Sequence, residues 1–363
     1  MSIDFCFERW QTVKETYRRW WAEDLDRPLL ALTVSGRDPS RPAPKLSSAK
    51  PPCMYDLAIS AEDIVDCWDY ELSRQKFLGD AYPHVWPNFG PGVLAAMLGA
   101  NAKASGYTVW FGPAEPREIA DIHFTYDADN VWLRRIKDIC QAAVNRWDGL
   151  VQVAMTDLGG NLDVLSSFRP NEALLLDLYD HPQEVDRLLW EAHEAWHACF
   201  ADISAILQPT NPGYSAWDGV FSERPYYILQ CDFCYMISPD MFDRFVKPEL
   251  VASCARLDNT IYHLDGVGQL AHLDSILEIE ALGGVQWVPG AGQPKGEHWL
   301  DVYAKIGAAG KRIWLARDMC EPSLIDTIAK RAGSPGRIVY QAWEGPDTQA
   351  SFTEVLDRYG LQG

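Results

Sequence analysis

The sequence predicts an α/β protein folded as a single (β/α)8 TIM barrel, and three observations support this prediction. Residues 226–294 read as strand, helix, strand, helix and strand. Polar side chains gather where these strands stop, and eight candidate strands can be counted along the chain. In such barrels the chemistry lies at the carboxyl ends of the strands. We therefore expect one domain over residues 1–363, with residues 1–27 forming an N-terminal helical extension.

Composition narrows the class of protein. The chain has 363 residues, 47% of them hydrophobic, and a formal net charge of −19. This charge should repel phosphate backbones and anionic membrane surfaces, so we expect neither nucleic acid nor a membrane as a partner. Nine cysteines in no framework spacing and an N-terminus without a signal-peptide pattern predict reduced thiols in the cytoplasm.

The first half of the chain is less regular. Residues 5–24 place aromatic and apolar side chains at helical spacing and lead into an apolar strand at residues 29–34. A proline-rich loop at 36–52 follows, long enough for a lid or a segment near a site. The spacing then predicts helices over 60–78 and 131–147.

A strand over 150–157 ends in Asp157 and is followed by Gly159 and Gly160. Residues 171–207 have helical periodicity, and His181-Pro182 predicts a break between two helices there. Beyond residue 212 strands and helices alternate. The remaining candidate strands are 214–217, 226–232, 260–264, 284–288, 312–315 and 338–341.

The most informative polar residues lie on two neighbouring strands. Because side chains alternate between faces, His263 and Asp265 share one face, as do Gln230 and Asp232. Apolar helices cover the outer face of a barrel, so these polar groups should point into the mouth. Converging strand ends would bring one polar set into a shared cavity: Asp157, Asp218, Asp232, His263, Asp265, Gln286, Arg317 and Gln341.

A His-x-Asp pair beside further carboxylates suits two kinds of chemistry. The imidazole could act as a general acid or base with a carboxylate fixing its tautomer, or the group could bind a metal through nitrogen and oxygen. Aromatic residues near strand ends, among them Trp217, Trp287 and Trp343, could wall a mainly apolar pocket for a small ligand.

Two further motifs are weaker. His193-Glu194-Ala195-Trp196-His197 matches the H-E-x-x-H zinc pattern, but no third ligand is evident, and we expect a structural helix. Cys231 and Cys234 have the spacing of a redox or zinc half-site without a second pair, and buried apolar cysteines explain them better.

The segment QCDFCYMISPDMFDRFVKPEL followed by NTIYHLDG resembles the uroporphyrinogen decarboxylase superfamily, which includes corrinoid-linked and thiol methyltransferases. The matching pattern is a strand, a Ser-Pro-x-x-Phe-x-x-Phe-x-x-Pro helix start and a strand ending in histidine. GDAYPHVWPNFGPGVLAAMLGA and FRPNEALLLDLYDHPQEVDRLL are also similar. The resemblance implies the (β/α)8 barrel, with the site at the carboxyl ends of the strands.

The chain departs from that family at its thiolates. In the zinc-dependent branch the strand ends in His-x-Cys and a late strand supplies a second cysteine, whereas here Asp265 and Gln341 lie at or near those positions. A zinc at His263 and Asp265 would therefore have more oxygen-rich ligation. The decarboxylase branch needs several basic residues near the first strand, where this chain offers Arg37 and Arg41.

We therefore expect a methyltransferase that moves a methyl group from or to a small molecule, with Asp232, His263 and Asp265 as catalytic residues. Zinc and a corrinoid on a separate partner protein are the cofactors that the resemblance suggests, and a homodimer is compatible with the sequence. Two alternatives stay open: a metal-independent decarboxylase or lyase with Arg37 holding a carboxylate, and a barrel that only binds a small molecule. The expected substrate-binding residues are Arg37, Trp217, Asp218, Gln230, Gln286, Trp287, Gln341 and Trp343.

Overall fold

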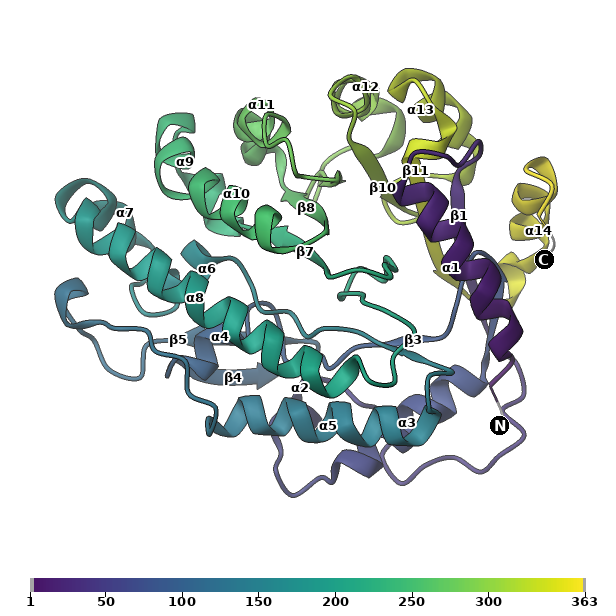
Figure 1. Ribbon diagram of the computed structural model, residues 1–363, viewed down its shortest axis with the longest axis horizontal. Coiled ribbons are helices and arrows are strands. Elements are labelled where there is room, and N and C mark those ends of the chain that lie inside the picture. The colour runs from purple at the N-terminus through teal and green to yellow at the C-terminus, as the bar shows by residue number, and fades with distance from the viewer. Residues whose placement is uncertain (1–2, 362–363) are drawn as a thin grey trace.

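A seven-stranded sheet organises the protein, whose computed structural model describes residues 3–361 (Figure 1). The strand order is β2-β1-β11-β10-β9-β8-β7, and every neighbouring pair is parallel except β1 with β2. The strands of this sheet are β1 (Leu29–Ser35), β2 (Gln75–Gly79), β7 (Tyr226–Gln230), β8 (Asn259–Asp265), β9 (Gly284–Val288), β10 (Arg312–Ala316) and β11 (Ile338–Glu344).

Helices alternate with these strands in the second half of the chain and cover one side of the sheet (Figure 1). In the described part of the chain the α-helices are α1 (Phe7–Trp21), α2 (Pro51–Tyr55), α3 (Ala61–Ser73), α4 (Leu94–Met97), α5 (Val131–Trp147), α6 (Asn161–Ser166), α7 (Asn171–Asp180), α8 (Pro182–Leu207), α9 (Pro239–Phe245), α10 (Lys247–Arg256), α11 (Leu273–Leu277), α12 (Leu300–Ala308), α13 (Ile325–Ala332) and α14 (Gln349–Arg358).

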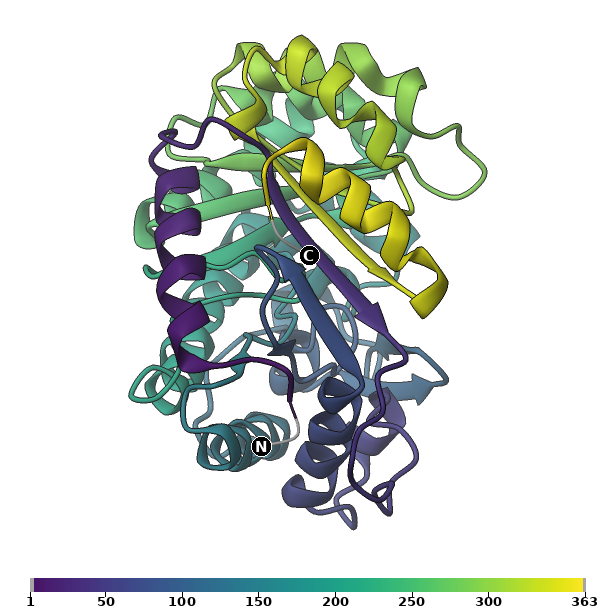
Figure 2. The same ribbon diagram turned by 90° about the vertical axis from the view of Figure 1, so that its right-hand side faces the viewer.

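The predicted helix over 60–78 is wrong in its last five residues. Ser60 caps α3 by accepting the Asp63 N–H at 3.0 Å, and the helix ends at Ser73. The chain then turns and forms β2, which runs antiparallel to β1 (Figure 2). Pairing with the edge of β1 satisfies the backbone of 75–79 as well as a helix would, so tertiary contact overrides the helical spacing.

A complete eight-stranded barrel is not recorded in the part of the chain that the structure describes. A second, two-stranded sheet pairs β3 (His84–Val85) with β6 (Gln152–Val153) in parallel, and β4 (Asn101–Ser105) pairs with β5 (Thr108–Gly112) as a hairpin. The predicted strand at 214–217 is wrong, since that segment has only an isolated bridge between Tyr214 and Ser222. Its backbone instead meets the end of β6, where Met155 N–H donates to Ser215 C=O at 2.9 Å.

Two other predicted elements are confirmed, whereas the strand predicted over 150–157 is wrong outside β6. The helix predicted at 131–147 is α5, and Asn130 caps it by accepting the Trp132 N–H at 2.9 Å. The break at His181-Pro182 separates α7 from α8, with the proline at the first position of α8, where its missing N–H costs nothing.

The helical lead-in is α1, whose Trp10, Tyr17 and Trp20 side chains are buried. Trp10 and Tyr17 pack against the rings of Tyr82 and Phe221. Trp10 donates its indole N–H to Leu150 C=O at 2.9 Å, and the Arg312 guanidinium lies over the Trp20 ring. These contacts tie the first helix to the segment before β6 and to β10. Across residues 3–361 we find no helix with the length and apolar content that a membrane crossing requires.

Candidate active site

Three neighbouring strands place polar side chains in one row across the sheet. In the register of β7, β8 and β9, Gln230 pairs with His263, and His263 pairs with Gln286. Paired residues of parallel strands project to the same face, so these three side chains lie side by side. Trp287, one residue after Gln286, projects to the opposite face and packs against Trp299 at 5.1 Å between ring centroids.

At the carboxyl ends of β7 and β8 the side chains of Asp232, His263 and Asp265 converge. One potential ligand atom from each lies within 4.8 Å of the others. His263 Nε2 is 3.9 Å from Asp265 Oδ2, and the His263 side chain is 14% exposed against 41% for Asp265. A partly sheltered imidazole with two carboxylates offers the mixed nitrogen and oxygen donors that divalent cations take in proteins.

Gln286 fixes which imidazole nitrogen is available. Its side-chain oxygen Oε1 contacts His263 Nδ1. A carbonyl oxygen can only accept, so Nδ1 carries the proton and the Nε2 lone pair points toward Asp265. Metal-bound histidines are oriented by partners of this kind. The donor chemistry around Nε2 therefore fits a metal ion.

Replacing Gln286 with leucine should release this orientation. We expect metal affinity to fall roughly 10- to 100-fold, because the His263 ring can then rotate and its proton is no longer held on Nδ1. Gln286→Glu keeps an acceptor at the same place and should recover most of the affinity. Titration with a competing chelator measures both variants, and equal affinity of Gln286→Leu and wild type would contradict the role.

Asp163 holds Asp232 in place. Asp232 opens the 3₁₀ helix η2 (Asp232–Met236), and its backbone N–H donates to Asp163 Oδ2 at 3.0 Å, while Phe233 N–H donates to Oδ1 at 2.7 Å. Burial, and then the Asp232 charge, raise the pKa of Asp163 to about 8 despite both hydrogen bonds. The pKa of Asp232 is itself raised, first by desolvation and then by Asp265, while His263 opposes the shift.

A third carboxyl, Asp157, lies deeper. It accepts the Gly159 N–H at 2.9 Å and the Gln230 side-chain N–H at 3.3 Å. Burial, with a smaller contribution from Asp232, raises the pKa of Asp157 to about 7. Gln230 thus connects the row containing His263 to a carboxyl that can hold a proton near neutral pH.

Two cavities are lined by residues from neighbouring segments, and neither lining includes Asp232, His263 or Asp265. The Gln341 cavity, of about 330 Å³, is lined by Gln341, Trp314, Thr33 and Arg317 among others. The tryptophan cavity, of about 370 Å³, is lined by Trp68, Trp86, Trp217, Trp343, Glu71 and Lys50 among others. Gln75, His84 and Trp343 line both. Trp217 also packs edge-on against His263 at 5.1 Å between centroids, so one ring borders both the cluster and the tryptophan cavity.

The structure separates some predicted site residues from this region. Arg37 contacts Ser73 C=O at 2.7 Å and Asp4 at 3.6 Å and lines neither cavity. Trp287 is fully buried on the outer face of the sheet. Asp218 is buried and accepts the Tyr226 hydroxyl hydrogen. Arg317 lines the Gln341 cavity but pairs with Glu344 at 3.1 Å and with Glu321 at 3.0 Å.

Burial of Asp218 should make stability depend on pH. Desolvation raises its pKa from 3.8 to about 7. A carboxyl whose folded pKa is raised contributes stability that is complete below its unfolded pKa and is lost as pH rises through the folded value. Asp218→Asn, which stays neutral, should therefore be more stable than wild type at pH 8, on the order of a few kcal/mol.

Urea unfolding at pH 5 and pH 8 measures this effect. We expect a smaller pH dependence for Asp218→Asn than for wild type. The exposed Asp240→Asn serves as the control and should follow the wild-type curve. If the free energy of unfolding depends on pH equally in Asp218→Asn and in wild type, the raised pKa of Asp218 is contradicted.

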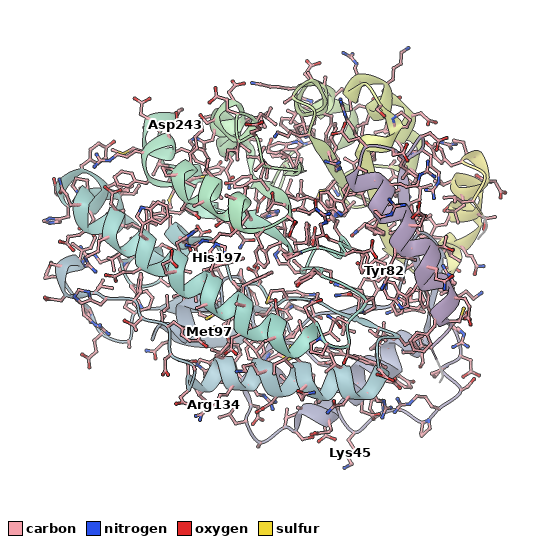
Figure 3. All side chains as sticks on the ribbon, viewed as in Figure 1. Lys45, Tyr82, Met97, Arg134, His197 and Asp243 are labelled. Atoms are coloured by element: carbon pink, nitrogen blue, oxygen red, sulfur yellow. The ribbon has the colours of Figure 1, made fainter. Side chains whose placement is uncertain are left out.

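The H-E-x-x-H motif lies on α8, away from the cluster. His197, which projects from α8 (Figure 3), and His193 both contact the Ser253 hydroxyl of α10, at 3.3 and 3.5 Å. Glu194 pairs instead with Arg256 on the surface. Cys231 and Cys234 are buried free thiols, and the Cys234 thiol lies 3.8 Å from the Tyr262 hydroxyl.

Sequence reasoning missed His84 and Asp163. His84 lies on a strand of two residues, too short for alternation to indicate a face. Its ring borders both cavities, and burial lowers its pKa to about 4. Asp163 follows two glycines in the first turn of α6, a position typical of capping, but its partner lies 69 residues away.

The fold and the site define an α/β protein with a candidate metal centre at the ends of parallel strands. No family model matches the sequence, and no curated protein matches it significantly. Among solved structures, a methyltransferase from Methanosarcina mazei has a similar fold, with a TM-score of 0.61 and 13% identity over 95% of this chain and 97% of that one. At this identity the similarity concerns the fold.

Proposed function

We propose that this protein is a methyltransferase that transfers a methyl group from or to a small molecule at the cluster of Asp232, His263 and Asp265. One observation carries the proposal: three donor atoms within 4.8 Å of one another lie at adjacent strand ends, beside a cavity walled by tryptophan. The methyltransferase with a similar fold supports the class of reaction.

We infer that the fold is the (β/α)8 barrel of the uroporphyrinogen decarboxylase superfamily. The β3–β6 pair would complete the ring between the β2 edge of the sheet and β7, giving eight parallel strands in chain order with the antiparallel β2 as an addition beside β1. Two hydrogen bonds at the open ends support this inference. The Leu158 N–H, which follows β6, donates to the Tyr227 hydroxyl of β7 at 2.7 Å, and the Asp80 N–H, which precedes β3, donates to Leu30 C=O of β1 at 2.8 Å.

A metal such as zinc, if bound, would be held by His263 Nε2 with the Asp265 and Asp232 carboxylates, and would supply Lewis-acid activation of the atom that gains or loses the methyl group. The residues of the chain have their own tasks. Gln286 orients His263, Asp163 positions Asp232, and the tryptophan cavity excludes water from the methyl-bearing part of the substrate. A corrinoid on a separate protein would be one acceptor or donor compatible with this arrangement.

The contacts of the nearby arginines do not support the lyase alternative. A decarboxylase would need a cation to hold the substrate carboxylate, and Arg37 contacts the protein backbone and Asp4 instead. The Arg317 guanidinium is already paired with two glutamates. We therefore favour methyl transfer.

Metal analysis tests the proposal. Protein purified with zinc supplied should hold about one ion per chain, and Asp265→Ala should lose it. Glu194→Gln, in the H-E-x-x-H motif, is the matched control and should keep the ion, because Glu194 lies in a surface ion pair. Absence of any metal from wild-type protein would remove the metal from the proposal, and metal loss in Glu194→Gln alone would place it on α8.

A further inference from the structure

The walls of the tryptophan cavity identify a class of ligand. Four of its lining residues are tryptophans, namely Trp68, Trp86, Trp217 and Trp343. The indole face carries negative electrostatic potential, and tryptophan is the best aromatic partner for a cation within about 6 Å. Several such rings around one small cavity are typical of sites that bind quaternary ammonium groups.

The charged residues around the cavity also favour a cationic ligand. Glu71 lines it, and no described residue forms an ion pair with the Glu71 carboxylate. Lys50 is the other charged residue of the lining, and it lies over the Tyr107 ring at 4.1 Å and donates to the Tyr107 hydroxyl at 3.0 Å. His84 is neutral at pH 7 because burial lowers its pKa to about 4.

The size and position also fit. A volume of about 370 Å³ holds a small molecule with a trimethylammonium head. The ring of Trp217 borders this cavity on one side and His263 on the other. A methyl group bound against Trp217 would therefore lie next to the cluster, and the net charge of −19 would attract a cationic ligand.

We propose that the tryptophan cavity binds trimethylammonium compounds, with the four indoles surrounding the cationic head and Glu71 balancing its charge. That the bound compound is a substrate rests on the proposed methyl transfer. Binding of the compound in the cavity does not depend on that reaction. A neutral methyl-bearing aromatic compound is the competing ligand class.

Calorimetric titration of the full-length protein tests the proposal with choline and its uncharged isostere 3,3-dimethylbutan-1-ol. We expect choline to bind roughly tenfold more tightly or better, since the two differ mainly in charge. Trp343→Ala should weaken choline binding roughly two- to fivefold, and because Trp343 is 65% exposed its loss should not unfold the chain. Glu71→Gln should weaken binding of choline and leave the isostere unchanged.

Trp110→Ala is the matched control, because Trp110 is 69% exposed and lines neither cavity. It should bind choline as wild type does. Equal affinity for choline and the isostere, tighter binding of methoxybenzene than of choline, or no detectable binding of choline would each overturn the proposal.

The Asp265→Asn variant separates this inference from the proposed function. It should bind choline normally and fail to transfer methyl groups. Choline binding without methyl transfer by wild type would contradict the proposed function alone. Methyl transfer from other donors without choline binding would contradict the ligand class alone.

Discussion

Asp232→Asn is expected to lower the turnover of methyl transfer at least about 100-fold, with the folded state intact. The substitution keeps the shape of the side chain and removes the charge, and with it the capacity to bind a cation strongly or to exchange a proton. Asp232 is exposed, and its contacts to Asp163 are made by the backbone, which the variant retains.

The measurement is kcat with saturating substrate, together with a urea unfolding curve. Asp240→Asn, an equally exposed aspartate on α9, is the matched control and should have wild-type activity. Wild-type turnover in Asp232→Asn would remove Asp232 from the reaction. A large loss of stability in the same variant would show instead that Asp232 is structural.

Gly160→Ala is expected to destabilise the protein by roughly 3 kcal/mol. A Cβ added at Gly160 would lie 2.2 Å from the backbone oxygen of Gln230 and 2.7 Å from Asp163 Oδ2. Neither the end of β7 nor α6 can move freely, because Asp163 links them through the Asp232 N–H. The change should therefore also displace Asp232.

Urea unfolding measures the first effect, and metal affinity by chelator competition measures the second. Gly112→Ala is the control, since an added Cβ there meets nothing within 4 Å. If Gly160→Ala changes the free energy of unfolding by less than about 0.5 kcal/mol, the close contact with Gln230 is contradicted, because a steric clash with the backbone should cost more than that.

The His263 site shows how far the sequence alone reaches. β8 has seven residues, long enough for alternation to place His263 and Asp265 on one face, and the structure agrees. Alternation also puts Trp287 on the face opposite Gln286, where it packs against Trp299, so nearness to a strand end does not by itself bring a side chain to the cluster.

Other parts of the site depend on contacts that no local pattern encodes. Asp163 reaches Asp232 across 69 residues, and β2 forms because the β1 edge is free to pair. The 214–217 segment has the residues of a strand but meets the end of β6 by a single backbone bond. Contacts between residues far apart in the sequence decide which strands pair, and the β-propensity of a segment is only weakly informative about this.

The most direct test of the account follows the methyl group itself. Wild-type protein loaded with zinc is incubated with ¹³C-methyl donors of three classes, a methoxyarene, a thioether and a trimethylammonium compound, and with a thiol or cob(I)alamin as acceptor. NMR should show the labelled methyl signal moving from a donor to an acceptor in wild type and not in Asp232→Asn. Turnover of a carboxylic acid with release of carbon dioxide, and no methyl transfer from any donor, would contradict the account.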